Sequence, residues 1–426
     1  MVAPPPTSKT NSRVRWFLAA ILVVALALRL LALVGAEPLP GRGDAQEYDQ
    51  IARHWLASGR YTTPGHGVPG AHLAIRTPGY PALLAGLYWT SQRLGLGRFG
   101  LLRPVQLLVD LASLLLVYAL GRRLFGRRVG LGAAACYAFY PPLLQSFTVA
   151  MTETVSVLLV LITAHLLLAG VEQGRGRHFA AAGVVAGLAI LVRPLTQLLG
   201  WPVLALAGLA AGWRRARGWL WGAAFLLALA LTLCPWLVRN RLVFGRPAPL
   251  STYGGINFFT GNYLPYRGYF RNTTYHLLDR VLAGRHLDEV ATDAAIRRAA
   301  WRNIAGYLRH QPLAYAGLVW QKFRVFWDCY FYPVDSSLIR PLGRPGNLLH
   351  RALLLLALPG LLLAGRRWRR TWPVLLLPAY LCLVQVAIIA EEGRYNIIAM
   401  PFVMVLACCG ALYLFAGLRQ LPVDDE

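Results

Sequence analysis

The sequence predicts an all-α polytopic membrane protein, with about ten helices long enough to span the bilayer. The 426 residues are 57% hydrophobic and only 14% charged, whereas an ordinary soluble domain has about a quarter of its residues charged. The apolar residues form blocks of roughly 15 to 22, the length that crosses a hydrocarbon layer of about 30 Å. Short breaks rich in Arg, Gly or Pro separate these blocks.

The charge and the cysteines narrow the class of protein. The formal net charge is +25, but a nucleic-acid-binding protein carries its basic residues as a patch on a soluble fold. Here the basic residues flank the apolar blocks. The 6 Cys residues lie almost all inside those blocks, so we infer neither a disulfide framework nor a zinc site. We therefore expect the bilayer, and no nucleic acid, as a partner.

The Arg-rich breaks orient the chain, because short basic loops remain in the cytoplasm. They lie at Arg13 and Arg15, at 122–128, 172–178, 213–218 and 365–370, and after Arg419. If all of them are cytoplasmic, the spans pair into hairpins and both termini are cytoplasmic. The expected spans are 16–36, 104–121, 129–149, 153–170, 179–192, 195–212, 219–238, 347–364, 371–390 and 396–416.

Two further apolar segments, 79–97 and 313–332, do not fit this alternation as spans. Both contain Trp and Tyr, which are favoured at the membrane surface, so we interpret them as interfacial helices. They lie in two long outer loops, 37–103 and 239–346. We expect residues 1–426 to form a single integral membrane domain without a separate soluble domain.

The acidic residues are predicted to lie on the outer side. Because ionisable groups at a membrane boundary are costly to keep, this concentration indicates where a reaction would take place. The residues are Asp44, Glu47, Asp49, Glu153, Glu391 and Glu392.

Asp44 and Glu47 open the first outer loop in the sequence GRGDAQEYDQIARHWLASG. Their spacing is typical of a helix capping box, with Gly59 placed to end the helix. The helix is also expected to lie flat on the membrane and to present Asp44 at its N-terminus, which is compatible with a cap. The helix dipole would keep this carboxylate ionised and able to accept a proton.

Three arginines accompany these carboxylates. Arg76 in RTPGYP is either a headgroup contact or a clamp on one phosphate, for which guanidinium offers a paired donor. Arg193 in LVRPL is predicted to lie at a sunken turn, where it needs an anionic partner such as Glu153 or a lipid phosphate. Arg394 in EEGRYN either forms a simple salt bridge with Glu391 or Glu392 or joins the same site.

The second outer loop contributes amides and aromatic rings. Residues 235–270 are rich in Gly, Asn and Tyr, which suit either irregular packing or the hydroxyls and ring faces of a sugar. Residues 275–310 are predicted to form an amphipathic helix that ends before Pro312 and covers the site. The candidate sugar or acceptor contacts are Tyr80, Tyr253, Asn257, Asn262 and Glu391.

In this order the motifs resemble the GT-C superfamily of membrane glycosyltransferases, in particular the bacterial branch related to protein O-mannosyltransferases and to the aminoarabinose transferase acting on lipid A. The resemblance rests on DAQEY, RTPGYP, TE at the head of the fourth span, LVRP, PWLVRN with STYGGINFFTGN, and EEGRYNIIAMP. It implies a GT-C-like fold and a polyprenyl-phosphate sugar donor.

The resemblance also implies roles for individual residues. Asp44 would be the catalytic base, and Arg76, Arg193 and Arg394, with Tyr395, would bind the donor phosphate. Glu47 and Glu153 are the other catalytic candidates. Family members often place two acidic residues side by side in the first loop, whereas this chain has DAQE, and the share of Glu47 is therefore open.

The sequence therefore predicts a hexosyl- or pentosyltransferase in the bacterial inner membrane, with its active site on the outer face. It would move a sugar, with inversion, to a hydroxyl of a protein, lipid or glycan. We expect no cofactor, with a divalent ion shared by Asp44 and Glu153 as the open alternative. The alternative functions are a non-catalytic lipid or solute transporter and a lipid-linked oligosaccharide ligase or polymerase.

Overall fold

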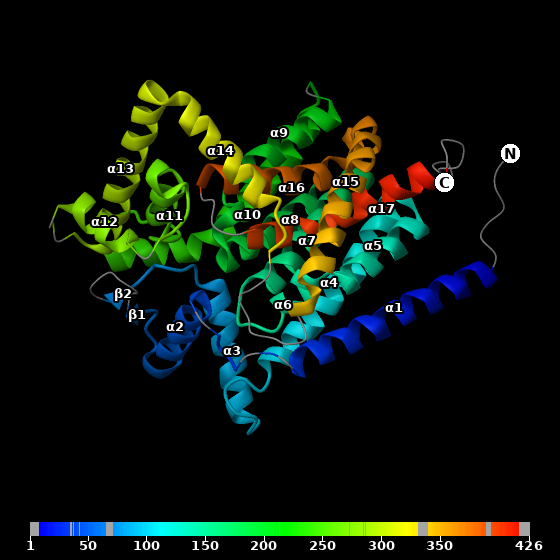
Figure 1. Ribbon diagram of the computed structural model, residues 1–426, viewed down its shortest axis with the longest axis horizontal. Coiled ribbons are helices and arrows are strands. Elements are labelled where there is room, and N and C mark those ends of the chain that lie inside the picture. Colours follow the sequence, from blue (N-terminus) through cyan, green and yellow to red (C-terminus); the bar gives the residue numbers. More distant parts are fainter. Residues whose placement is uncertain are drawn as a thin grey trace.

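A computed structural model of the protein describes residues 8–34, 36, 38–41, 43–64, 71–212, 214–271, 273–283, 285, 287–330, 340–388 and 393–416. These residues are almost entirely helical (Figure 1). The exception is a two-stranded antiparallel ladder, β1 (Thr63–Pro64) and β2 (Ala71–His72), in which Thr63 lies opposite His72. The predicted all-α membrane fold is confirmed.

Within the described residues, 6 helices are long and apolar enough to cross a membrane. They are α1 (Ser8–Val34), α4 (Leu102–Phe125), α7 (Glu153–Gln173), α10 (Ala216–Phe244), α15 (Gly343–Arg366) and α16 (Trp368–Ile388). The other predicted spans coincide with shorter helices. These are α5 (Arg127–Phe139), α8 (Gly176–Val192), α9 (Gly200–Ala211) and α17 (Met400–Ala416).

Three predicted boundaries are wrong. The expected span 129–149 breaks at Tyr140, and the chain continues as α6 (Pro141–Ser146), because Pro141 and Pro142 lack the N–H groups that would continue the helix. The expected span 195–212 begins with a 3₁₀ turn, η1 (Pro194–Thr196), before α9. The amphipathic stretch 275–310 forms two helices, α12 (Thr274–Leu282) and α13 (Glu289–His310), separated after Ala283, which has a φ of 52°.

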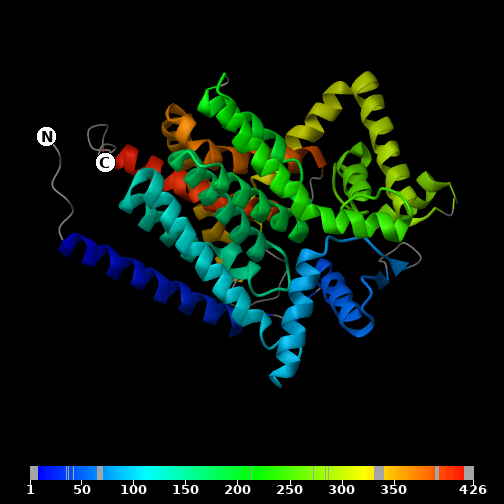
Figure 2. The same ribbon diagram turned by 180° about the vertical axis from the view of Figure 1, so that it is seen from behind.

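The predicted interfacial segments form α3 (Gly79–Arg93) and α14 (Pro312–Phe326), each of 15 residues. The remaining loop elements are α2 (Asp44–Ser58), α11 (Gly254–Gly261), η2 (Leu264–Tyr266), η3 (Arg340–Leu342) and η4 (Gly393–Ile398). Figures 1 and 2 show that α1 begins and α17 ends at one end of the bundle, whereas α2, α11 and α12 lie at the opposite end. The two long loops therefore meet at one end of the molecule.

Close helix packing holds this bundle together. A Cβ at Gly360 in α15 would overlap the carbonyl oxygen of Leu406 in α17, and a Cβ at Gly410 would overlap that of Leu356. Small residues allow such approach between membrane helices, where dispersion contacts replace the hydrophobic driving force of water.

A buried ion pair joins the first helices of the bundle. Arg29 in α1 donates from Nε to Oδ2 of Asp110 in α4 at 2.5 Å, and from Nη1 to the carbonyl of Ala138 at 2.8 Å. The hydroxyl of Tyr137 donates to the other Asp110 oxygen at 2.9 Å. Arg29 and Asp110 are 0% and 1% exposed, so each charge depends on its partner for solvation.

Replacing Asp110 with Asn is expected to destabilise the protein by about 3–5 kcal/mol, because it leaves the Arg29 charge buried without a counter-charge. Thermal unfolding in detergent would measure this loss. The matched control is Glu172→Gln, which removes the partly exposed pair that Glu172 forms with Arg123 at 2.7 Å and is expected to cost about 0–1 kcal/mol. Equal effects of the two changes would contradict a structural role for the buried pair.

Candidate active site

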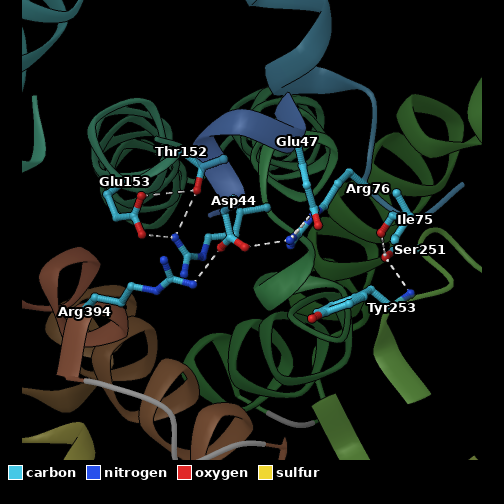
Figure 3. Close-up of polar contacts among 10 residues, drawn as sticks. Asp44, Glu47, Ile75, Arg76, Thr152, Glu153, Ser251, Tyr253 and Arg394 are labelled. Atoms are coloured by element: carbon cyan, nitrogen blue, oxygen red, sulfur yellow. Dashed lines mark hydrogen bonds and ion pairs between the residues drawn. The ribbon is translucent and has the colours of Figure 1, made fainter. Parts of the chain in front are cut away.

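Asp44, the first residue of α2, lies between two arginines (Figure 3). Its Oδ1 accepts from Nη2 of Arg76 at 2.7 Å, and its Oδ2 accepts from Nη2 of Arg394 at 2.7 Å. Arg76 also donates from Nε to Oε2 of Glu47 at 2.7 Å. The cluster therefore joins the first outer loop to η4, which lies close to the end of the described chain.

A second ion pair lies beside this cluster. Nη1 of Arg193 donates to Oε1 of Glu153 at 2.5 Å and to Oγ1 of Thr152 at 3.0 Å. Glu153 is fully buried at the start of α7, and Arg193 follows the last residue of α8. The predicted anionic partner for Arg193 is thus Glu153, and Thr152 accepts from this arginine instead of capping the helix.

Three tyrosines flank the guanidinium groups. The Arg76 guanidinium carbon lies 4.8 Å from the ring centre of Tyr253 and 5.4 Å from that of Tyr48. Tyr395 lies under both Arg193 and Arg394, at 4.6 Å and 5.3 Å. These rings favour the cationic form and hold the guanidinium planes in place.

The segment that carries Arg76 is fixed by the second outer loop. The Ser251 hydroxyl donates to the carbonyl of Ile75 at 2.6 Å, and the amide of Thr252 donates to the carbonyl of Ala74 at 3.0 Å. The Glu289 carboxylate, at the start of α13, accepts from the amides of Leu73 at 2.7 Å and Ala74 at 3.1 Å. It also accepts from the hydroxyl of Thr252. The backbone of Arg76 is therefore positioned before any ligand binds.

A glycine brings the two halves of the site together. Gly79 begins α3, and a Cβ there would lie 2.6 Å from the backbone carbon of Leu191 and 2.7 Å from the backbone nitrogen of Val192. Only glycine permits this approach. Because Arg76 and Arg193 lie just outside this contact, Gly79 sets the spacing between the two arginines, and the motif RTPGYP gains a structural explanation.

The electrostatics of Asp44 follow from this geometry. Burial acts to raise the pKa of Asp44, but Arg76 and Arg394 outweigh it and hold the pKa well below its usual range. The carboxylate is ionised at neutral pH, as the sequence predicted, although the cause is the arginine pair. The capping-box interpretation is wrong, because Gly43 is the N-cap residue and no side chain caps the helix.

Only some of the candidate sugar contacts lie in or beside the Asp44 cluster. Tyr253 belongs to the cluster, and Tyr80 packs edge-on against Tyr48 at 5.1 Å with its buried hydroxyl lacking a partner in the described structure. Asn257 is half-buried in α11. The side chain of Asn262 is hydrogen-bonded to other groups of the protein. Glu391 lies outside the described residues.

Lys322 in α14 was not singled out from the sequence. Its Nζ donates to Oδ1 of Asn262 at 3.0 Å, and the Tyr315 hydroxyl donates to the same oxygen at 2.9 Å. The Asn262 amide donates to the carbonyls of Phe258 and Ala387. Lys322 is 1% exposed, and burial lowers its pKa to about 7. This network connects α14 to α11 and α16, and it takes Asn262 out of contact with the cluster.

Comparisons with known proteins agree with the architecture. Residues 82–238 match the family model described as dolichyl-phosphate-mannose-protein mannosyltransferase. The comparison with curated proteins found no match.

Solved structures are similar over nearly the whole chain. The archaeal oligosaccharyltransferase AglB from Archaeoglobus fulgidus, in complex with an inhibitory peptide and a dolichol-phosphate, has a TM-score of 0.58 at 14% identity, covering 96% of this chain and 51% of that one. Its apo form gives 0.58 at 13% identity, with 95% and 51% covered. ArnT from Cupriavidus metallidurans gives a TM-score of 0.41 at 17% identity, with 95% and 78% covered.

These matches show that the chain has the membrane fold of AglB, and the family-model match agrees with the resemblance seen in the motifs. The chain spans about half the length of the oligosaccharyltransferase that it matches, 51%. The segment matched by the family model begins within α3 and ends within α10. It therefore includes Glu153 and Arg193 but not Asp44, Arg76 or Arg394, which the tertiary structure adds to the same site.

Replacing Arg394 with Gln is expected to raise the pKa of Asp44, because burial is then opposed by fewer positive charges. Infrared difference spectra against Asp44→Asn would follow the protonated carboxyl band during an acid titration. In the wild type the band should emerge only below the usual pH range of an aspartate, and in Arg394→Gln it should emerge at higher pH.

The same shift predicts the direction of a stability change. Since the folded-state pKa lies below the unfolded value, ionised Asp44 stabilises the fold above the unfolded pKa, and this contribution is lost as the pH falls through the folded pKa. Arg53→Gln is the control, because Arg53 donates to Asp49 at 3.0 Å instead. An unchanged Asp44 titration in Arg394→Gln would show that the arginine does not set this pKa.

Proposed function

We propose that this protein is a glycosyltransferase that moves a sugar from a polyprenyl-phosphate donor to an acceptor hydroxyl. The observation that carries the proposal is the position of Asp44 between Arg76 and Arg394, each 2.7 Å from a different carboxylate oxygen. A base and a phosphate-binding pair are thereby held within reach of one bound molecule. The chain shares its fold with AglB, which was solved in complex with a dolichol-phosphate, and this similarity supports the assignment.

The two arginines connect donor binding to the activation of Asp44. A phosphate offers the guanidinium groups the same paired acceptor geometry as a carboxylate. When the donor phosphate binds Arg76 and Arg394, it draws these groups away from Asp44. The carboxylate then loses the positive charges that lower its pKa and becomes a stronger base. Arg193, with Tyr395 beneath it, adds a third positive charge next to the leaving phosphate.

The reaction is a single displacement. The acceptor hydroxyl gives its proton to Asp44 while its oxygen forms a bond to the anomeric carbon. The bond from that carbon to the phosphate oxygen breaks, and polyprenyl phosphate leaves with the electron pair. One displacement inverts the anomeric centre. The arginines stabilise the charge that gathers on the phosphate, since fixed donors stabilise a developing anion without reorganising.

Secondary roles follow from the contacts around Asp44. Glu47 and Glu153 act as positioning residues, because each holds an arginine at 2.5–2.7 Å. Tyr80 is our candidate to donate to a sugar oxygen, since a buried hydroxyl without a partner is uncommon. Tyr253, Asn257 and Glu391 are candidates for contact with the sugar or acceptor. Asn262 is better assigned to holding Lys322.

We also propose the cellular setting. The active site lies on the outer face of a bacterial inner membrane, with both termini in the cytoplasm, and the acceptor is a protein, lipid or glycan. The common end shared by the start of α1 and the end of α17 supports this topology (Figure 2). A transporter is less well supported, because the charged groups of the cluster gather at one end of the bundle.

The proposal is tested by incubating the purified protein with a panel of polyprenyl-phosphate sugars and a mixture of membrane acceptors. One donor is expected to be consumed, with release of polyprenyl phosphate. Asp44→Asn should lower the turnover at least about 100-fold, the scale of general-base catalysis, while donor binding persists. The control is Asp49→Asn on the same helix, whose carboxylate accepts from Arg53 and is expected to leave turnover largely intact.

Two results would overturn this assignment. Turnover by Asp44→Asn at the wild-type rate would remove Asp44 as the base. Movement of the intact donor across the membrane without cleavage of the sugar–phosphate bond would identify a transporter.

We further propose that transfer needs no bound metal. Among the residues that the structure describes, no group of three His, Cys, Asp or Glu side chains is arranged to hold a metal ion. Asp44 and Glu153 each bond to guanidinium groups, with which a divalent ion would have to compete. The initial rate is therefore expected to be unchanged by a chelator such as EDTA. Loss of activity with EDTA and recovery with Mg²⁺ or Mn²⁺ would refute a metal-free site.

A further inference from the structure

A second polar pocket lies on the same end of the protein as the active site. Its volume is about 370 Å³. It is lined by Arg267, Tyr269 and Arg271, from the loop after η2, and by Gln321, Arg324 and Asp328, from the end of α14. None of the members of the Asp44 cluster lines it, so this pocket is separate from the proposed catalytic site.

The charge of this pocket is unbalanced. Three arginines and a single acidic residue line it. Among the described residues, no acidic side chain forms an ion pair with Arg267, Arg271 or Arg324. Elsewhere in the outer loops arginines do have such partners, as Arg297 does with Asp293 at 2.6 Å. Several arginines around one pocket attract an anion, and the planar donors of guanidinium groups match the oxygens of a phosphate.

Backbone geometry fixes one of these arginines against α14. Arg267 has a φ of 53° and Gly268 a φ of 79°, the left-handed region that residues other than glycine seldom adopt. Gln321 accepts from Nε of Arg267 at 3.4 Å and donates to the carbonyl of Arg267 at 3.2 Å. A strained position held by two side-chain contacts indicates that the direction of Arg267 matters.

The neighbouring face of α14 identifies the kind of anion. Trp320 and Phe323 are 61% and 40% exposed, and their rings stack with centres 5.4 Å apart. Trp320 precedes Gln321, and Phe323 precedes Arg324. The two aromatic rings therefore lie about 100° around the helix from the two pocket residues. Exposed aromatic rings on an interfacial helix are typical contacts for lipid chains and headgroups.

We propose that this pocket binds the phosphate group of an anionic membrane lipid, whose chains lie along Trp320 and Phe323. The lipid holds α14 at the membrane surface and fastens the loop of Arg267 and Arg271 to it. Because Lys322 on the same helix is bonded to Asn262, the bound lipid supports the wall between α14 and α11. This proposal does not depend on the reaction assigned to Asp44.

The test is native mass spectrometry of the full chain after exchange into micelles with phosphatidylglycerol or phosphatidylcholine. The wild type is expected to retain phosphatidylglycerol in preference to phosphatidylcholine. The triple variant R267Q/R271Q/R324Q should bind it at least about tenfold more weakly, since each change removes a charge-assisted contact. The matched control is R280Q/R298Q/R302Q, which removes the same charge from exposed positions of α12 and α13.

A further variant distinguishes binding of a lipid phosphate from binding of inorganic phosphate. Trp320→Ala should weaken retention of phosphatidylglycerol and leave binding of inorganic phosphate unchanged. If inorganic phosphate binds as tightly as the lipid, or if the triple variant retains phosphatidylglycerol like its control, the lipid site is refuted. Should the triple variant fail to fold, Arg324→Gln alone serves the same comparison, because its side chain is exposed at the end of α14.

Discussion

Asp44 is bound by two guanidinium groups that come from distant parts of the chain. Arg76 lies 32 residues after it, and Arg394 lies 350 residues after it. The carboxylate therefore connects the first outer loop to η4, the turn before the last helix. Without it, two partly buried cations would face each other at the end of the bundle. The tyrosines, the turn at Gly79 and the contacts of Glu289 all serve to keep these charges in register.

Arginines and carboxylates are also paired in the rest of the bundle. Arg29 and Asp110 pair between α1 and α4, and Arg193 and Glu153 pair between α8 and α7. An unpaired charge in a low-dielectric region is costly, so each of these carboxylates is placed where an arginine can reach it. The two ion pairs of Asp44 differ in one respect. They are partly open to solvent, with Asp44 25% exposed, and the proposed function uses this opening for a phosphate that replaces the carboxylate as partner.

Under the proposed function, this arrangement explains how one site could bind an anion and contain an anionic base. In the resting protein the two arginines keep Asp44 ionised, and each of them is bonded to one of its carboxylate oxygens. In that proposal, a lipid-linked phosphate competes for the same donors, and its arrival releases the carboxylate next to the acceptor. Donor binding and base activation would then be one event, so that Asp44 acts as a base only once the donor is in place.

Much of the fold follows from the sequence, because bilayer thickness and backbone hydrogen bonding leave few choices for long apolar blocks. All ten expected spans contain a helix, and the two aromatic segments outside them became α3 and α14. The errors lie at 140, 194 and 283, where proline or a left-handed residue decides a helix end. Such local breaks depend on single residues that a hydropathy pattern averages out.

For the candidate site too, the sequence identified some features and missed others. Composition and position in the loops identified Asp44, Glu153 and the three arginines, since charged residues at the membrane boundary are few. The choice of partner was not readable from the sequence. Glu47 was a candidate both for a helix cap and for catalysis, yet it bonds to Arg76, and the pairing of Arg29 with Asp110 inside the apolar blocks was not predicted. Residue type and the bilayer alone determined which charges exist and at which end they gather. Only the tertiary structure decided which charges touch, because pairing depends on side-chain distances between segments that the sequence places hundreds of residues apart.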